Sequence, residues 1–231
     1  LVFDQRYRDR YLFTAKGPRQ PLPGSWYRAG VAAKSSTLGG LAEKIGVPAE
    51  ALAHVMFTSG STGRPKGVTM GHDNMLAAAA AIQAYLGYQA DDVVLCALPL
   101  SFDYGLYQVL MGFLKGATLV LERSFSFPVK VLELMEREKV TVFPGVPTMF
   151  SLLMNLKTLR DHPLPALRKI TNTAAALSEE HIRQLRSLFP HALLFSMYGL
   201  TECKRVTYLP PEQLDIRPTS VGRGMPNEEV W

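Results

Sequence analysis

Short apolar runs alternate with longer helical stretches along most of this chain of 231 residues. Strands are predicted at residues 54–58, 92–98, 117–121, 140–143, 168–172 and 192–196, because each of these runs is short and largely apolar. Helices are predicted between them, at residues 74–86, 104–114, 129–139, 147–155 and 179–188. This alternation favours an α/β fold with a largely parallel sheet, in which ligands bind beyond the carboxyl ends of the strands.

Three residues are predicted to mark helix ends. Asp73 and Ser178 can each accept a hydrogen bond from the first turn of the helix that follows. Gly87 can adopt the left-handed conformation that ends the first helix. Asp103 stands just before the helix predicted at 104–114, so a helix cap is one interpretation of its carboxylate.

The composition narrows the choice of partners. Hydrophobic residues make up 47% of the chain and charged residues 19%, which indicates a globular protein rather than a disordered one. The net charge of +5 is modest, and no nucleic-acid partner is expected. Two cysteines provide no disulfide framework, so a cytoplasmic location is predicted. No apolar run is long enough for an integral membrane segment, and the five histidines show no metal-ligand spacing.

One loop combines glycines, hydroxyls and a lysine directly after the first predicted strand. Its sequence is Thr58, Ser59, Gly60, Ser61, Thr62, Gly63, Arg64, Pro65, Lys66 and Gly67. Glycines permit sharp turns, and backbone N–H groups, hydroxyls and a lysine can all contact an anion. A Walker A loop is excluded because its lysine follows a glycine directly, whereas Lys66 follows Pro65. The rigid Pro-Lys-Gly ending argues against a mere flexible turn, so a polyphosphate site is predicted.

A second group of residues follows the strand at 192–196. Tyr198 can stack on a purine, Thr201 can donate to a phosphate oxygen, and the carboxylate of Glu202 can hold Mg²⁺. Taken alone, Tyr198 to Glu202 could equally be an ordinary turn at the end of a strand. Next to it, Lys204 and Arg205 are expected to form a solvated pair.

The loop resembles, at every position, the phosphate-binding signature of the AMP-forming adenylating enzymes. That superfamily contains acyl-CoA synthetases, luciferases and the adenylation domains of peptide synthetases. The resemblance implies the large N-terminal domain of such an enzyme, with ATP and Mg²⁺ as cofactors. It implies that Tyr198 and Gly199 lie beside the adenine, that Thr201 reaches the α-phosphate, and that Glu202 binds magnesium with help from Thr58. Lys66 would steady the departing pyrophosphate with the hydroxyls of Ser59, Ser61 and Thr62.

Two further segments take roles from this resemblance. Ala174, Ala175 and Ala176 occupy the place of the family's small-residue segment, which lies along the adenine and is usually glycine-rich. Their small side chains suit close ligand approach and tight packing equally well. Phe102, Asp103 and Tyr104 resemble the region beside the acyl pocket, with Phe102 as its gate. In peptide-synthetase domains an aspartate at the place of Asp103 pairs with the substrate's α-amino group.

The function that the resemblance implies is ATP-dependent activation of a small-molecule carboxylate. An acyl-adenylate forms first, and a thiol such as coenzyme A then takes the acyl group. Two alternatives stay open: an amino-acid adenylation domain that loads a carrier protein, and a non-catalytic ATP-binding module. The run from Tyr198 to Pro211 is most similar to acyl-CoA ligases associated with bacterial exosortase loci, which is a narrower expectation.

The resemblance covers residues 53–231 as a partial AMP-binding core and leaves residues 1–52 poorly assigned. A start at Leu1 rather than methionine, and an end at Val230-Trp231 in what reads as the start of a strand, suggest a longer protein. Family members continue into a strand with a ribose-binding aspartate and a mobile lid with a catalytic lysine, neither of which this sequence contains. The chain alone is therefore expected to bind nucleotide weakly and to complete neither half-reaction.

Overall fold

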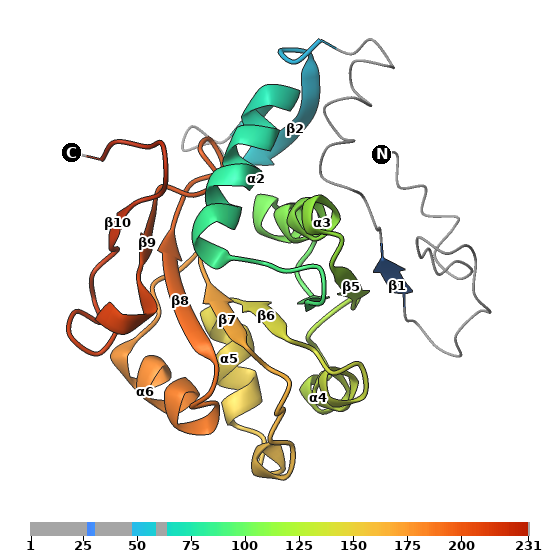
Figure 1. Cartoon of the computed structure of the whole chain (residues 1–231), viewed down its shortest axis with the longest axis vertical. Helices are drawn as coiled ribbons and strands as arrows, with labels where there is room; N and C mark the ends of the chain where they lie inside the picture. Colours follow the sequence, from blue (N-terminus) through green and yellow to red (C-terminus); the bar gives the residue numbers. More distant parts are fainter. Residues whose placement is uncertain (1–26, 31–47, 59–63, 231) are drawn as a thin grey trace.

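A mixed sheet forms the centre of the computed structural model, which describes residues 48–58 and 64–230, and the backbone of residues 27–30 (Figure 1). In spatial order its strands are β1 (Tyr27–Gly30), β5 (Thr118–Leu121), β4 (Val93–Cys96), β6 (Val142–Gly145), β7 (Lys169–Asn172), β8 (Leu193–Tyr198), β9 (Thr207–Leu209) and β10 (Arg223–Gly224). The five strands from β5 to β8 run parallel, and β1, β9 and β10 join antiparallel at the two sides. The predicted α/β class with a largely parallel sheet is confirmed.

The helices lie on both faces of this sheet (Figure 1). They are α2 (His72–Leu86), α3 (Asp103–Lys115), α4 (Pro128–Arg137), α5 (Pro147–Met154) and α6 (Glu179–Leu188). From β4 the chain crosses through α3 to β5, and it then moves back across the sheet through α4, α5 and α6. Because such crossovers are right-handed, α3 lies on the face opposite to the other three. The strand order therefore reverses between β4 and β6, which is where open α/β sheets bind ligands.

The predicted helix ends are only partly correct. Gly87 ends α2 in the left-handed conformation at φ 60°, and the hydroxyl of Ser178 accepts the N–H of His181 at 3.2 Å, as expected. The cap of α2 is Gly71 rather than Asp73, because the helix begins earlier, at His72. The carboxylate of Asp73 instead accepts the N–H of Asn74, from within the first turn.

The strand that precedes the glycine-rich loop is not part of the main sheet. β2 (Leu52–Thr58) pairs antiparallel with β3 (Lys66–Gly71) in a separate two-stranded sheet. The sequence did not predict β3, because its two glycines and lysine are poor strand formers. At the other end of the chain Val230 is not in a strand, contrary to expectation, and Trp231 lies outside the described residues.

A buried carboxylate holds the amino ends of the parallel strands together. Asp92 is fully buried and accepts hydrogen bonds from Thr141 (2.6 Å), Arg168 (2.7 Å) and Lys169 (3.2 Å), and from the N–H of Gln89 (2.8 Å). Burial alone would raise the pKa of Asp92, but these hydrogen bonds and the charge of Lys169 outweigh it and lower the pKa. Asp92 therefore links β4 to residues at the start of β6 and β7.

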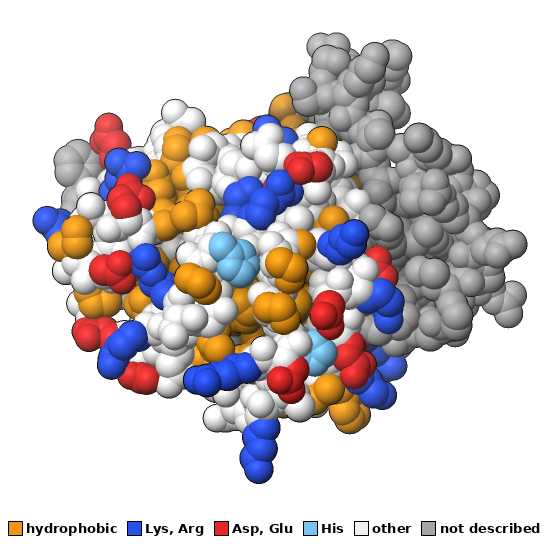
Figure 2. All heavy atoms as spheres, turned by 60° about the horizontal axis from the view of Figure 1, so that its bottom comes forward, with side chains coloured by type: hydrophobic (Ala, Val, Ile, Leu, Met, Phe, Trp, Pro, Cys, Tyr) orange, Lys and Arg blue, Asp and Glu red, His pale blue; other side chains and the backbone are white. Residues whose placement is uncertain are grey.

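Among the described residues, no helix is long and apolar enough to cross a membrane. On the face that Figure 2 shows, the described Lys and Arg side chains are interspersed with Asp and Glu side chains.

Candidate functional site

The turns that follow β7 and β8 lie side by side at the carboxyl edge of the sheet. Asn172 at the end of β7 pairs with Ser196 in β8, so the segments after them leave neighbouring strands at nearly the same level. The first segment contains the three alanines, and the second contains Tyr198 to Glu202. The structure therefore brings together two segments that lie more than twenty residues apart in the sequence.

The alanine segment is open to solvent. Ala174, Ala175 and Ala176 are all exposed, so packing does not account for their small side chains. The side-chain amide of Asn172 donates to the carbonyl of Ala175 at 3.0 Å, and Ala174 has a φ of 70°. The side-chain carbonyl oxygen of Asn172 is buried and has no partner among the described residues. This segment forms a fixed, uncovered backbone surface next to the turn after β8.

The turn after β8 is tight and also exposed. Tyr198 pairs with Thr207 of β9, which closes the turn, and a Cβ on Gly199 would collide with the carbonyl oxygen of Lys204. The requirement for glycine at this position is therefore explained by the turn itself. Tyr198 is 45% exposed, Glu202 is exposed, and Thr201 is half-buried. An aromatic ring and a carboxylate are thus presented outward from one short segment.

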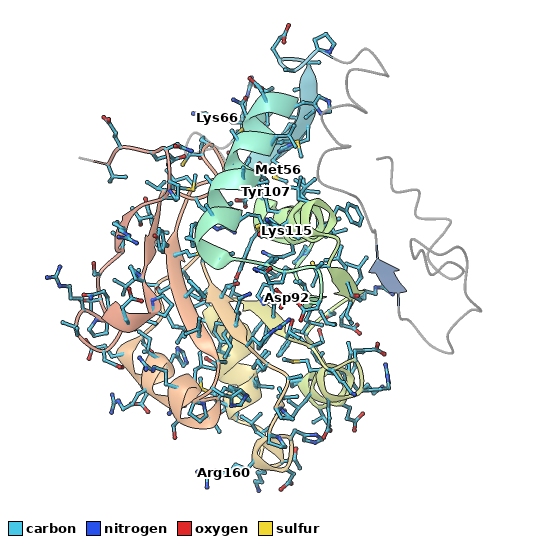
Figure 3. All side chains as sticks on the ribbon, viewed as in Figure 1. Met56, Lys66, Asp92, Tyr107, Lys115 and Arg160 are labelled. Atoms are coloured by element: carbon cyan, nitrogen blue, oxygen red, sulfur yellow. The ribbon has the colours of Figure 1, made fainter. Side chains whose placement is uncertain are left out.

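The hairpin of β2 and β3 carries the ends of the glycine-rich loop. Thr58 is paired with Lys66 across the hairpin, and Lys66 is exposed. Predicted site residues Ser59, Gly60, Ser61, Thr62 and Gly63 lie outside the described residues. In Figure 3 Lys66 lies near the top of the molecule, far from Arg160 at the bottom.

An electrostatic interaction places this hairpin close to the turn after β8. His54 of β2 has a lowered pKa, first because of burial and then because of the positive charge of Lys204, while Asp103 acts in the opposite sense. His54, four residues before Thr58 in β2, therefore lies near Lys204 in the turn after β8.

The three predicted pocket residues at the start of α3 differ in exposure and in contacts. Phe102 is the cap residue of α3 and is 63% exposed. Asp103 is the first residue of the helix rather than its cap, so the capping interpretation is wrong. Its carboxylate instead pairs with Arg205 at 3.3 Å. Tyr104 is buried, and its hydroxyl donates to the backbone carbonyl of Thr171 at 2.7 Å, so it ties α3 to β7.

The sequence-based prediction was wrong about Lys204 and Arg205, which are two buried cations. Lys204 and Arg205 are 2% and 3% exposed, so they are not a solvated pair. The guanidinium carbon of Arg205 lies 4.6 Å from the centre of the Tyr104 ring. The only sequence signal was their position after Glu202, since Asp103 and Tyr104 lie about a hundred residues away.

Magnesium fits this edge through a single protein carboxylate. Glu202 makes no hydrogen bond or ion pair to a described residue, and the described part of the chain has no group of three or more acidic, His or Cys side chains that could hold a metal. Magnesium is commonly bound through one or two carboxylates together with substrate phosphates, so Glu202 is a suitable ligand.

One hollow bordered by described residues lies elsewhere. Its volume is about 430 Å³, and it is lined by Tyr85, His191, Leu193, Tyr208 and Arg223, among others. Neither the alanine segment after β7 nor the turn after β8 contributes to it, so it is not the candidate site.

The fold defines an α/β protein whose open carboxyl edge, with an exposed aromatic and an exposed acidic side chain, is where such sheets bind their ligands. The family of AMP-binding enzymes matches residues 14–231, so this chain belongs to that family. The match begins within the segment that the sequence left poorly assigned. The resemblance to AMP-forming adenylating enzymes is thereby confirmed, whereas the narrower resemblance to exosortase-associated ligases stays a prediction.

Several relatives of this chain are named as CoA ligases. The chain is 31% identical to 4-coumarate-CoA ligase 1 of Narcissus pseudonarcissus over 196 residues, which are 81% of this chain and 36% of that protein. It is 37% identical to a 2-succinylbenzoate–CoA ligase of Arabidopsis thaliana, over 67% of this chain and 28% of that protein. The chain thus spans about a third of the length of these relatives.

Solved structures show the same fold. VinN in complex with L-aspartate is 42% identical, with a TM-score of 0.70 over 78% of this chain and 45% of that chain. The N-terminal domain of FACL13 from Mycobacterium tuberculosis is 26% identical, with a TM-score of 0.70 over 76% of this chain and 44% of that chain. The predicted similarity to the N-terminal domain of adenylate-forming enzymes is confirmed.

Proposed function

We propose that this chain forms the nucleotide- and carboxylate-binding part of an enzyme that activates a carboxylate with ATP and passes the acyl group to coenzyme A. Membership of the AMP-binding family and relatives named as CoA ligases support this proposal. The observation that carries it is the pair of exposed segments after β7 and β8, with Tyr198 beside three exposed alanines. A flat aromatic side chain next to an uncovered backbone suits a purine ring.

The chain's own residues would bind and orient the nucleotide. The adenine would lie between Tyr198 and the backbone of Ala174, Ala175 and Ala176, with Gly199 keeping the turn close. The hydroxyl of Thr201 would donate to an α-phosphate oxygen. Lys66 and the loop hydroxyls would donate to the β- and γ-phosphates, which leave as pyrophosphate.

Magnesium is the implied metal ion, and Glu202 would hold it with help from Thr58. When bound, it would neutralise part of the negative charge on the phosphates. Thr58 stands directly before the glycine-rich loop and opposite Lys66, so a metal there would lie next to the phosphates that Lys66 contacts.

The proposed reaction has two steps. A carboxylate oxygen of the substrate attacks the α-phosphorus, the bond to the bridging oxygen of pyrophosphate breaks, and an acyl-adenylate forms. A thiol then loses its proton to solvent and attacks the acyl carbon, the bond from that carbon to the phosphate oxygen breaks, and AMP leaves with the bonding electrons. In the first step Lys66 and Thr201 would stabilise charge on phosphate oxygens, which makes them, with Glu202, the proposed catalytic residues. Phe102 and Tyr104 would border the acyl group.

A second candidate is adenylation of an amino acid for delivery to a carrier protein. VinN has been solved with L-aspartate and with 3-methylaspartate, and the chain is 42% identical to it. The carboxylate of Asp103 is 16% exposed and lies at the same edge, so it could receive a substrate ammonium group. If this candidate is correct, Asp103→Ala in the complete protein abolishes selectivity for the amino acid in pyrophosphate exchange.

Both cysteines of the chain are free thiols, which supports the proposed cytoplasmic location.

A non-catalytic ATP-binding module is the remaining alternative. It predicts nucleotide binding without carboxylate-dependent pyrophosphate exchange, even when the natural flanking sequence is included.

Calorimetric titration of AMP with Mg²⁺ into the 231-residue chain tests the central proposal. We expect weak but saturable binding that is lost in Tyr198→Ala. The matched control is Phe127→Ala, an aromatic side chain that is 68% exposed and follows β5, four strands from β8. Binding that is absent, or equal in both variants, would contradict the proposed site.

A further inference from the structure

The turn that carries Thr201 and Glu202 is held from inside by two consecutive buried cations. Lys204 and Arg205 are 2% and 3% exposed, and Lys204 has a left-handed φ of 64°. Burying a cation is unfavourable unless hydrogen bonds or opposite charges compensate. The contacts of these two residues therefore indicate what the burial achieves.

We call the turn after β8, which carries Thr201 and Glu202, the nucleotide-side turn. Lys204 holds the backbone of this turn. Its ammonium group donates to the carbonyl oxygen of Thr201 at 2.6 Å. Burial lowers the pKa of Lys204, and the negative charge of Asp103 acts in the opposite sense. Within the described part of the chain no carboxylate lies within ion-pair distance of Lys204, so the Thr201 carbonyl is its main stabilising contact.

Arg205 extends in the other direction, to the wall of the proposed carboxylate pocket. One guanidinium nitrogen donates both to Asp103 at 3.3 Å and to the carbonyl of Lys204 at 2.5 Å. The same group lies over the ring of Tyr104. A continuous set of contacts thus runs from the first turn of α3, through Arg205 and Lys204, to the backbone of Thr201.

Arg205 also has an unused donor. Its Nε–H is buried and has no acceptor among the described residues. Buried donors of this kind are seldom left unpaired in native proteins, so the contacts with Asp103 and Lys204 do not fully satisfy Arg205.

From these contacts we infer that Arg205 is a positioning residue that couples the carboxylate pocket to the nucleotide-side turn. It fixes Thr201 and Glu202 only while it is paired with Asp103, and a ligand in the pocket acts on the nucleotide turn through this pair. The inference rests on the proposed function, because it assigns the turn to the nucleotide and the start of α3 to the carboxylate.

AMP binding in the presence of Mg²⁺ tests the inference, since AMP alone does not occupy the carboxylate pocket. Arg205→Met and Asp103→Asn are each expected to weaken AMP binding about tenfold, within the range of ordinary coupling between sites. The double variant should bind no more weakly than the weaker single variant, because both changes break one contact. Arg205→Lys keeps the charge but loses the planar contact with Tyr104, so it should recover part of the affinity.

Arg223 offers a matched control. Its guanidinium carbon lies 5.3 Å from the centre of the Tyr208 ring, and it donates to the Tyr208 hydroxyl at 2.8 Å. Arg223 is exposed, whereas Arg205 is buried, and Tyr208 is the aromatic partner of Arg223 where Tyr104 is that of Arg205. Arg223→Met removes the same kind of Arg–Tyr contact, and we expect wild-type AMP affinity. A purely structural role for Arg205 would lower thermal stability and leave AMP affinity unchanged.

Each result of the AMP-binding measurements either supports or contradicts the inference. Wild-type AMP affinity in Arg205→Met, or additive losses in the double variant, would overturn the inference while the proposed function stands. No AMP binding by the wild-type chain would remove the proposed function and this inference with it. If Arg205→Met does not fold, the comparison of Asp103→Asn with Arg223→Met carries the test.

Discussion

The two edges of the parallel sheet differ in whether their buried polar groups have hydrogen-bond partners. At the amino edge, Asp92 is fully buried and both of its carboxylate oxygens accept hydrogen bonds. At the carboxyl edge, buried polar atoms have no partner among the described residues: the hydroxyls of Tyr107 and Thr207, the side-chain carbonyl of Asn172 and Nε of Arg205. The nitrogens His54 Nε2 and His181 Nδ1 are also buried without a partner among the described residues. The buried polar groups of the amino edge stabilise the fold, whereas the carboxyl edge is the proposed binding edge.

The largest expected effect belongs to the amino edge. Asp92→Ala leaves Arg168 and Lys169 without their buried partner and should lower the free energy of unfolding by about 3 kcal/mol. Urea denaturation followed by circular dichroism measures this. Asp91 contacts Arg168 from a 71% exposed position, so Asp91→Ala should leave the midpoint nearly unchanged. Equal effects of the two substitutions would show that Asp92 is not the buried anchor.

At the carboxyl edge, Gly199→Ala should reduce both stability and binding. The new Cβ would lie 2.8 Å from Cα of Arg205 and would also collide with the carbonyl of Lys204, so the turn must open. We expect a loss of about 2 kcal/mol in unfolding free energy, together with loss of AMP binding. Gly87→Ala is a useful comparison, because a Cβ there meets nothing within 4 Å, although φ is 60°. Intact AMP binding in Gly199→Ala would separate this turn from the nucleotide.

Lys204→Met should change stability and binding in opposite directions. Removing a buried cation that has no carboxylate partner among the described residues relieves its desolvation, so unfolding free energy should rise by about 1 kcal/mol. The Thr201 carbonyl loses its donor, and AMP affinity should fall about fivefold. The exposed Lys115 is the control, and Lys115→Met should alter neither quantity. A variant that is both less stable and unchanged in affinity would contradict the contrast between the two edges.

The smallest expected effect is the pH dependence of the amino edge. The folded-state pKa of Asp92 lies below the ordinary value of 3.8, so its contribution to stability is complete above that pH. The contribution is lost as pH falls through the folded-state pKa, because the unfolded chain then binds the proton more readily. Denaturation series between pH 2.5 and pH 7 should show a shallower acid decline in Asp92→Asn than in wild type. Parallel curves would remove Asp92 as the cause.

Local patterns in the sequence predicted most of the sheet and its helices. The runs that became β4 to β8 are short and apolar, and Ser178 acts within three residues of its own position, so no distant information was needed. The predictions from local sequence failed where pairing with another segment determines the structure. The strand at 54–58 left the main sheet because β3 pairs with it, and β3 has little strand character of its own.

The site shows the same limit more sharply. Tyr198 and Glu202 were proposed as site residues from a short motif and the alanines from the family resemblance, and the structure adds that these residues are exposed on neighbouring segments. The burial of Lys204 and Arg205 could not be predicted. Two adjacent cations normally indicate a solvated surface, and only folding brings Asp103 and Tyr104 against Arg205.

The pairing of Thr58 with Lys66 has a consequence for how the loop between them can vary. Cross-strand partners are held about 5 Å apart, so the ladder of β2 and β3 fixes both ends of the connection at residues 59–65. The entropy of closing such a connection grows slowly, by about 0.6 kcal/mol for each doubling of its length. Insertions within the connection should therefore be tolerated by the fold and leave the lysine anchored, so loop length and cation position can evolve independently.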